Sequence, residues 1–246
     1  MIELFLLGAA RIRPPGSLPT ITRLPPKPLA LLAYLAVAEA RGLQRRDRLV
    51  ALLWPECDQS RARCALRQAL AVLRDTLGPE ALEAGGLEEI GLAGSRVRTD
   101  VHVFRAAADA GRWDEAIRLF GGPLLDGLQI PQAHDFMDWL DQSRARLLRT
   151  YVRCLESVAT RGEQRGEWGD AFEWWYRLAD LEPLNVRVAA ALVRCQAAGG
   201  DPAGALRRAE ECTRQVREET GVDPAPELES AFADGCRVWR ERRRPA

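Results

Sequence analysis

Three stretches of this 246-residue sequence share one template: Gly111-Arg-Trp-Asp-Glu-Ala116-Ile117, Gly166-Glu-Trp-Gly-Asp-Ala171-Phe172 and Gly200-Asp-Pro-Ala-Gly-Ala205-Leu206. In each copy a glycine is followed by four residues, an alanine and an apolar residue. Glycine permits the tight turn at which the chain reverses after a helix, and alanine permits two helices to approach closely. The template therefore predicts antiparallel helix pairs that pack against their neighbours.

The spacing of these copies indicates which kind of helical repeat is present. The second and third copies lie 34 residues apart, which is the period of tetratricopeptide repeats. Pro183 falls near the end of the second copy, where that repeat places a proline. We therefore predict a mainly α protein in which residues 100–246 form a tetratricopeptide-like domain, with residues 1–99 as a separate α+β domain.

The pattern of apolar and turn-forming residues in 1–99 predicts short strands, then three helices, then a hairpin. Short apolar and alternating runs predict strands near residues 2–7, 10–13 and 18–22. Apolar spacing predicts helices from Leu29 to about Gly42, over 45–54 and over 60–77, the last with Ser60 as its N-cap. Residues 91–94 are predicted as a hairpin tip. This order is typical of a winged helix-turn-helix, in which the second helix of the unit enters the major groove.

The predicted third helix carries an arginine ridge. At about 100° per residue, Arg63, Arg67 and Arg74 lie within roughly 40° of one another, beside an apolar stripe. A guanidinium group donates two parallel hydrogen bonds, which suits guanine edges and phosphates. On this basis the predicted DNA-binding residues of the helix are Arg63, Arg67, Gln68 and Arg74, with Ser60 and Arg61 at its start. The residues predicted to neutralise phosphates are Arg45 and Arg46, together with Arg96 and Arg98 on the predicted wing hairpin.

The first half of the chain also resembles a known family of bacterial regulators. Lys27-Pro-Leu-Ala-Leu-Leu-Ala-Tyr-Leu-Ala36 resembles the first winged-helix helix of the Streptomyces antibiotic regulatory protein family. Arg46-Asp-Arg-Leu-Val-Ala-Leu-Leu-Trp-Pro55 resembles its second helix, and Ala65-Leu-Arg-Gln-Ala-Leu70 with Leu73-Arg74 its third. The sequence departs from the family pattern at Cys64, at Ala71-Val72 and at Glu89-Ile-Gly-Leu92.

The second half resembles the bacterial transcriptional activator domain of the same family. The resemblance rests on Phe136-Met-Asp-Trp139, Arg144-Ala-Arg146-Leu147, Glu219-Thr-Gly-Val-Asp-Pro224 and Pro226-Glu-Leu228. It implies an activator with an OmpR-type winged helix that binds repeated promoter sites on double-stranded DNA. It also implies RNA polymerase and a second copy of the chain, as a homodimer, as partners.

Composition and motifs argue against other classes of protein. The chain is 47% hydrophobic and 28% charged with a formal net charge of zero, which is typical of a globular protein. No apolar run is long enough for a membrane span, and the first ten residues lack the basic start of a secretion signal, so we expect a cytoplasmic protein. No phosphate-binding loop, dinucleotide fingerprint or nucleophile elbow occurs, and the six cysteines form no Cys-x-x-Cys pair. We therefore expect no enzyme activity, no cofactor and no metal site.

Two alternatives stay open at this stage. The chain is an interaction scaffold if its winged helix no longer binds DNA, which the departures at Cys64, Ala71 and Val72 favour. It is a small-molecule receptor if the tryptophan-rich second half encloses an effector. The eight arginines from Arg41 to Arg74, opposed by only Asp47, Glu56 and Asp58, favour DNA.

Overall fold

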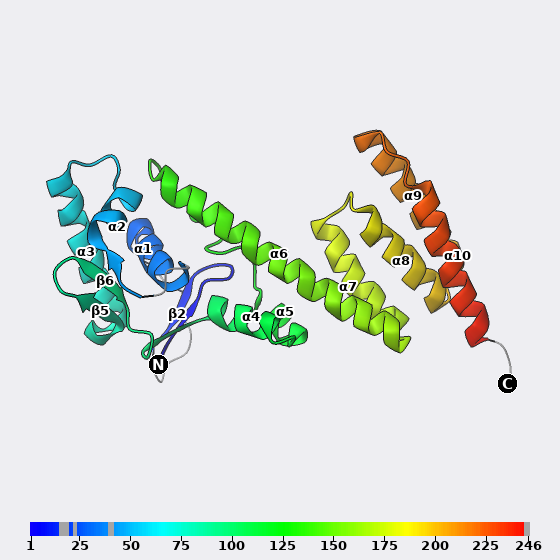
Figure 1. The fold of residues 1–246 in the computed structure, drawn as a ribbon, viewed down its shortest axis with the longest axis horizontal. Helices are drawn as coiled ribbons and strands as arrows, with labels where there is room; N and C mark the ends of the chain where they lie inside the picture. The colour runs from blue at the N-terminus through cyan, green and yellow to red at the C-terminus, as the bar shows by residue number, and fades with distance from the viewer. Residues whose placement is uncertain (15–19, 22–23, 39–41, 244–246) are drawn as a thin grey trace. The chain divides into compact units, whose positions relative to one another are not determined.

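The computed structural model describes residues 1–14, 20–21, 24–38 and 42–243 (Figure 1). Contacts divide the chain into two compact units, Met1–Tyr151 and Val152–Ala246, and each is described by itself. The division falls inside the long helix α6 (His134–Arg165), not at the residue 100 boundary that the composition suggests. Residues 100–151 thus belong to the same compact unit as the predicted DNA-binding domain. The boundary at residues 99 and 100 stays a prediction.

A four-stranded sheet begins the first unit. It contains β1 (Ile2–Phe5), β2 (Arg11–Arg13), β3 (Thr20–Ile21) and β7 (Val97–Thr99), in the order β3-β2-β1-β7. β1 pairs antiparallel with β2 and parallel with β7. The predicted strands at residues 2–7 and 10–13 are confirmed, and β3 lies inside the predicted third strand, whose residues 18, 19 and 22 lie outside the described residues.

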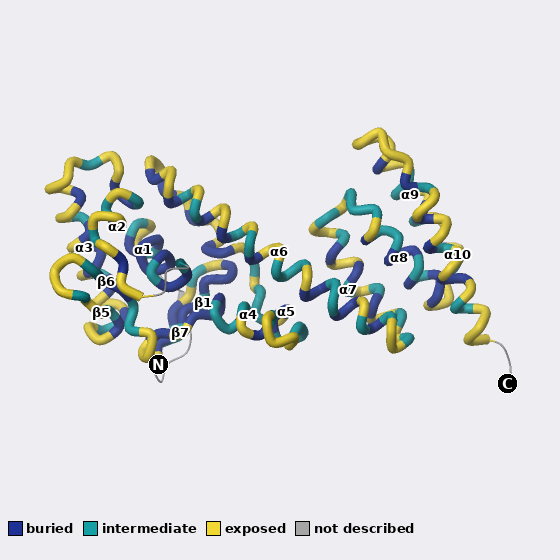
Figure 2. Tube along the Cα trace, viewed as in Figure 1, coloured by how far each residue is buried: buried dark blue, intermediate teal, exposed yellow. Residues whose placement is uncertain are grey.

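The helices of the winged helix follow the sheet. They are α1 (Pro26–Val37), α2 (Arg46–Leu53) and α3 (Gln59–Leu77). α1 starts three residues earlier than predicted because prolines are compatible with the first turn of a helix, and it is buried along most of its length (Figure 2). The predicted N-cap Ser60 is wrong: the side chain of Asp58 accepts the hydrogen bond from the Arg61 backbone N–H.

A second sheet contains the hairpin that follows α3, residues 82–92, which is the wing of the winged helix. β4 (Gln44–Arg45) lies between α1 and α2, whereas β5 (Leu82–Gly85) and β6 (Glu89–Leu92) follow a 3₁₀ turn at Pro79–Ala81. The three strands pair in the order β4-β6-β5. The hairpin therefore turns at residues 86–88, and the predicted tip at 91–94 is wrong. Its residue Gly91 lies buried inside β6, where the backbone of Gly42 approaches so closely that a Cβ atom would meet its carbonyl oxygen at 2.9 Å.

Residues after β7 pack onto the first sheet. Leu7 forms an antiparallel bridge with Leu124, and the Leu125 N–H donates to the Leu6 carbonyl oxygen at 2.8 Å. Tyr34 of α1 meets Trp139 of α6 edge to face, with ring centroids 4.9 Å apart. These contacts explain why residues 100–151 share one compact unit with the winged helix.

The repeat template forms the same turn three times. Gly111, Gly166 and Gly200 each have a positive φ, and they precede α5 (Trp113–Leu119), α7 (Trp168–Leu181) and α9 (Pro202–Thr220). The N–H after each glycine bonds to a carbonyl oxygen five residues earlier, which is the Schellman arrangement of a helix C-terminus. The three template alanines are fully buried: Ala116, Ala171 and Ala205. The predicted helical reversals are confirmed, the first after α4 (Asp100–Asp109).

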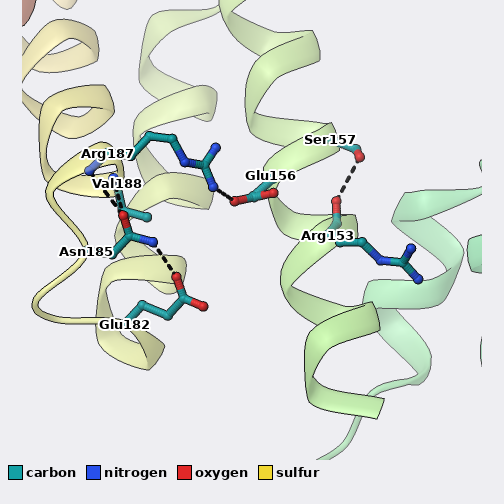
Figure 3. A network of polar contacts seen from close by, with 7 residues as sticks. All are labelled: Arg153, Glu156, Ser157, Glu182, Asn185, Arg187 and Val188. Atoms are coloured by element: carbon teal, nitrogen blue, oxygen red, sulfur yellow. Dashed lines mark hydrogen bonds and ion pairs between the residues drawn. The ribbon is translucent and has the colours of Figure 1, made fainter. Parts of the chain in front are cut away.

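The second unit is held together by polar contacts as well as apolar packing. Besides α7 and α9 it contains α8 (Val186–Gly199) and α10 (Ala225–Arg242). Glu163 of α6 accepts hydrogen bonds from the Trp175 Nε1–H at 2.6 Å and from the Arg194 guanidinium at 2.9 and 3.0 Å. At the start of α8, Asn185 caps the helix and Arg187 pairs with Glu156 of α6 (Figure 3). Together these contacts connect α6, α7 and α8.

Candidate nucleic-acid interface

The arginine ridge is set by the helix periodicity of α3. Its buried stripe faces α1 and α2 and contains Ala62, Leu66, Ala69, Leu70, Leu73 and Leu77. Because the ridge positions lie just beside this stripe on the helical wheel, they remain outside the core. Arg63, Arg67 and Arg74 are exposed, as are Ser60, Arg61 and Gln68. The structure thus places all six predicted helix residues on the surface of α3.

Carboxylates are close to some of these arginines and not to others. Arg61 pairs with Asp58 at 3.3 Å, and Arg63 pairs with Asp47 of α2 at 3.1 Å. Arg67 and Arg74 form no ion pair with a described residue. Exposed ion pairs contribute about 0–1 kcal/mol, and a single contact leaves most N–H groups of a guanidinium free for a second acceptor. The paired arginines therefore remain available to a second acceptor.

The residues predicted to neutralise phosphates are dispersed. Arg45 is exposed on β4, and Arg46 begins α2 with its Nε atom buried and without a hydrogen-bond partner among the described residues. Arg96 precedes β7 and pairs with Glu80 at 2.9 Å, and Arg98 lies on β7 in the four-stranded sheet. Because the hairpin turns at residues 86–88, neither Arg96 nor Arg98 is on the wing, and that placement was wrong.

The actual wing is acidic, which the sequence reading missed. Residues 75–95 contain five acidic residues and no lysine or arginine. Three of the acids lie on the hairpin, at Glu83, Glu88 and Glu89, and at its turn the side chain of Leu87 is 89% exposed. The adjacent glycines at 85 and 86 are a turn signal that would have located this hairpin.

Residues at the start of α3, at the start of α2 and at the wing turn line an open surface concavity of about 560 Å³. Arg46, Arg63 and Arg67 line it together with the carboxylates of Asp47 and Glu88. Sequence spacing brings Arg63 and Arg67 together, but the approach of Asp47 and Glu88 results from packing of segments remote in the chain. This concavity offers three guanidinium groups and two carboxylates to a partner that lies against α3.

Comparison with known proteins assigns the fold and the family. Residues 94–234 match the bacterial transcriptional activator domain. The chain belongs to this family. Over 218 residues it is 28% identical to the regulatory protein AfsR of Streptomyces coelicolor, a match that covers 83% of this chain and 21% of AfsR. The chain spans about a fifth of the length of that relative. Its resemblance to the Streptomyces antibiotic regulatory protein family is therefore confirmed.

A solved structure supports the fold of this bacterial transcriptional activator domain protein over most of its length. Mycobacterium tuberculosis EmbR, solved in complex with a low affinity phosphopeptide, superposes with a TM-score of 0.70 and 22% sequence identity. The superposition covers 96% of this chain and 65% of the EmbR chain. At this identity the likeness concerns the fold, and it confirms the mainly α architecture with a winged helix and helical repeats. None of the described helices is both long and apolar enough to span a lipid bilayer.

Proposed function

We propose that this family member is a sequence-specific DNA-binding regulator that places α3 in the major groove of promoter DNA. The observation that carries the proposal is the exposed ridge of α3, where Arg67 and Arg74 form no ion pair with a described residue. The helix N-terminus, with Ser60 and Gln59, lies at the same concavity as Arg63 and Arg67. A bidentate contact from one such arginine to guanine discriminates by about 1–3 kcal/mol.

Phosphate contacts in this proposal come from residues around the ridge. Arg61 lies in the first turn of α3, Arg46 lines the same concavity as Arg63 and Arg67, and Arg45 directly precedes Arg46. We assign these three residues to the DNA backbone. Arg96 and Arg98 stand outside the wing, and we expect them to contribute less. Because the wing carries only acidic charges, its turn does not neutralise phosphates in this protein.

Alanine substitution of Arg67 tests the proposal. A duplex selected by the wild-type chain from a random library is titrated by fluorescence anisotropy at several salt concentrations. Arg67→Ala should weaken binding by about 5- to 150-fold if the arginine contacts a guanine. The wild-type log–log salt slope should be near −0.9 for each phosphate neutralised. Arg118→Ala, which removes one exposed charge from α5, is the matched control and should bind as the wild type does. Equal binding by Arg67→Ala and Arg118→Ala would contradict the proposal.

For residues 100–246 we propose a role in dimerisation or in docking of a partner such as RNA polymerase. The helical repeats support this role because stacked helix pairs offer extended surfaces for protein contacts. Sedimentation velocity of the full chain, with and without the selected duplex, tests for a dimer. A single monomeric species in both samples would leave partner docking as the role of this domain.

The second candidate is an interaction scaffold without DNA binding. It is favoured by the ion pairs of Arg61, Arg63 and Arg96 and by the acidic wing. A chain that binds no duplex even at low salt, yet retains its folded circular dichroism spectrum, would support the scaffold and contradict DNA recognition.

A further inference from the structure

Arg63 is the one ridge arginine among the described residues whose guanidinium is held by a carboxylate of another helix. Its Nη2 donates to the Asp47 Oδ1 at 3.1 Å, which connects the first turn of α2 to the second turn of α3. The side chains are 53% and 49% exposed, so both partners face solvent. This contact uses one of the five N–H groups of the guanidinium. The remaining N–H groups are therefore available to a second acceptor.

The surroundings of the pair disfavour a phosphate there. Asp47 lines the concavity beside Arg63, and Glu88 of the wing turn lines the same concavity. A phosphate bound to Arg63 would therefore lie close to a carboxylate, and like charges at short range repel. A base edge carries no net charge and has no such conflict. The two carboxylates thus lower the affinity of this surface for phosphates more than its affinity for base edges.

We propose that Asp47 is a positioning residue for sequence selectivity. Its carboxylate orients the Arg63 guanidinium toward a base edge and weakens binding to DNA in which that base is absent. The inference rests on the proposed DNA recognition by α3. It adds to that recognition the residue Asp47, whose negative charge is repelled by the phosphates of DNA. Arg67 provides the contrast, because it forms no ion pair with a described residue.

The test measures selectivity as well as affinity. The wild type and Asp47→Asn are titrated with two labelled duplexes: one selected from a random library by the wild-type chain, and a scrambled duplex of the same composition. Asp47→Asn should bind the scrambled duplex about threefold more tightly, because one repulsive charge is lost. The ratio of the two affinities should fall about tenfold, because Arg63 loses the charged acceptor that orients it and keeps only a weaker amide acceptor. Asp47→Glu, which retains the carboxylate, should recover most of the ratio.

Two further variants separate orientation from a general charge effect. Asp75→Asn removes an exposed carboxylate from a later turn of α3, so it should leave the ratio unchanged. In an Arg63→Ala background, Asp47→Asn should no longer change the ratio, because the residue it positions is absent. Thermal unfolding of each variant verifies that the fold is retained.

The possible failures are distinguishable. A wild-type chain that enriches no sequence from the library refutes DNA recognition itself, and this inference with it. Enrichment by the wild type, with the same selectivity ratio in Asp47→Asn, overturns the role of Asp47 alone. A loss of ratio that persists in the Arg63→Ala background also overturns it, since Asp47 would then act without Arg63.

Discussion

Asp100 connects the N-terminal sheet to the first repeat helix, and its removal should destabilise the first unit. The side chain is buried at the start of α4, where it accepts hydrogen bonds from the backbone N–H groups of Leu6, Leu7 and Val101 at 2.8 to 3.0 Å. Asp100→Ala leaves these three buried donors without their acceptor. At about 1 kcal/mol or more for each unsatisfied donor, the loss is about 3 kcal/mol.

The cost of burying the Asp100 charge reduces the expected loss. Burial raises the pKa of the Asp100 carboxyl, so removal of this buried charge recovers part of the loss. We therefore expect Asp100→Ala to lower the free energy of unfolding by about 2–3 kcal/mol. Asp100→Asn, which keeps one acceptor oxygen, should lose about 1–2 kcal/mol.

Urea unfolding monitored by circular dichroism measures the stability, and hydrogen exchange read by mass spectrometry locates the effect. Exchange should accelerate in residues 1–10 of Asp100→Ala, because two of the three N–H groups that lose their acceptor, those of Leu6 and Leu7, are there. Asp109→Ala, at the exposed end of the same helix, is the control and should change little. Asp100→Ala with the stability of this control and unchanged exchange in residues 1–10 would refute the reasoning.

Three other predictions follow from contacts in the two units. Gly235→Ala should destabilise the protein by about 1–3 kcal/mol, because the new Cβ would meet the Arg194 carbonyl oxygen at 2.5 Å. Gly169→Ala has open space around its Cβ and should gain about 0.5 kcal/mol in stability. Equal urea midpoints for the two variants would contradict this prediction. Glu163→Ala should lower the free energy of unfolding by about 2–3 kcal/mol, because it removes the acceptor for Trp175 and Arg194. Urea unfolding monitored by tryptophan fluorescence measures this change, and a loss below about 0.5 kcal/mol would contradict the prediction. The Lys27 hydrogen bond lowers the pKa of Glu56 below 4.5, so this pair contributes stability above that pH and loses it as pH falls through the lowered pKa. NMR titration should find the Glu56 pKa restored toward 4.5 in Lys27→Gln, and an unchanged value would count against the pair.

Sequence reasoning predicted the features that depend on neighbours in the chain. The reversals at Gly111, Gly166 and Gly200 follow from the conformational freedom of glycine after a helix, and the structure confirms them. The ridge of α3 follows from helical periodicity, because a stripe with 3.6-residue spacing determines which side chains stay outside the core. The wing was misplaced because the prediction put the turn at Gly91 and Gly94, whereas strand pairing places it at residues 86–88, where the adjacent glycines at 85 and 86 begin the turn.

Local sequence thus specified the helices, their turns and the outward arginines, since each depends on backbone propensity and spacing within a few residues. Tertiary packing decided which carboxylate meets Arg63 and which backbone groups meet Asp100. Asp47 precedes Arg63 by 16 residues and Asp100 follows Leu6 by 94, and no periodicity relates positions so far apart. These pairs arise from the way helices and strands pack, because burial of apolar stripes sets which polar side chains become neighbours.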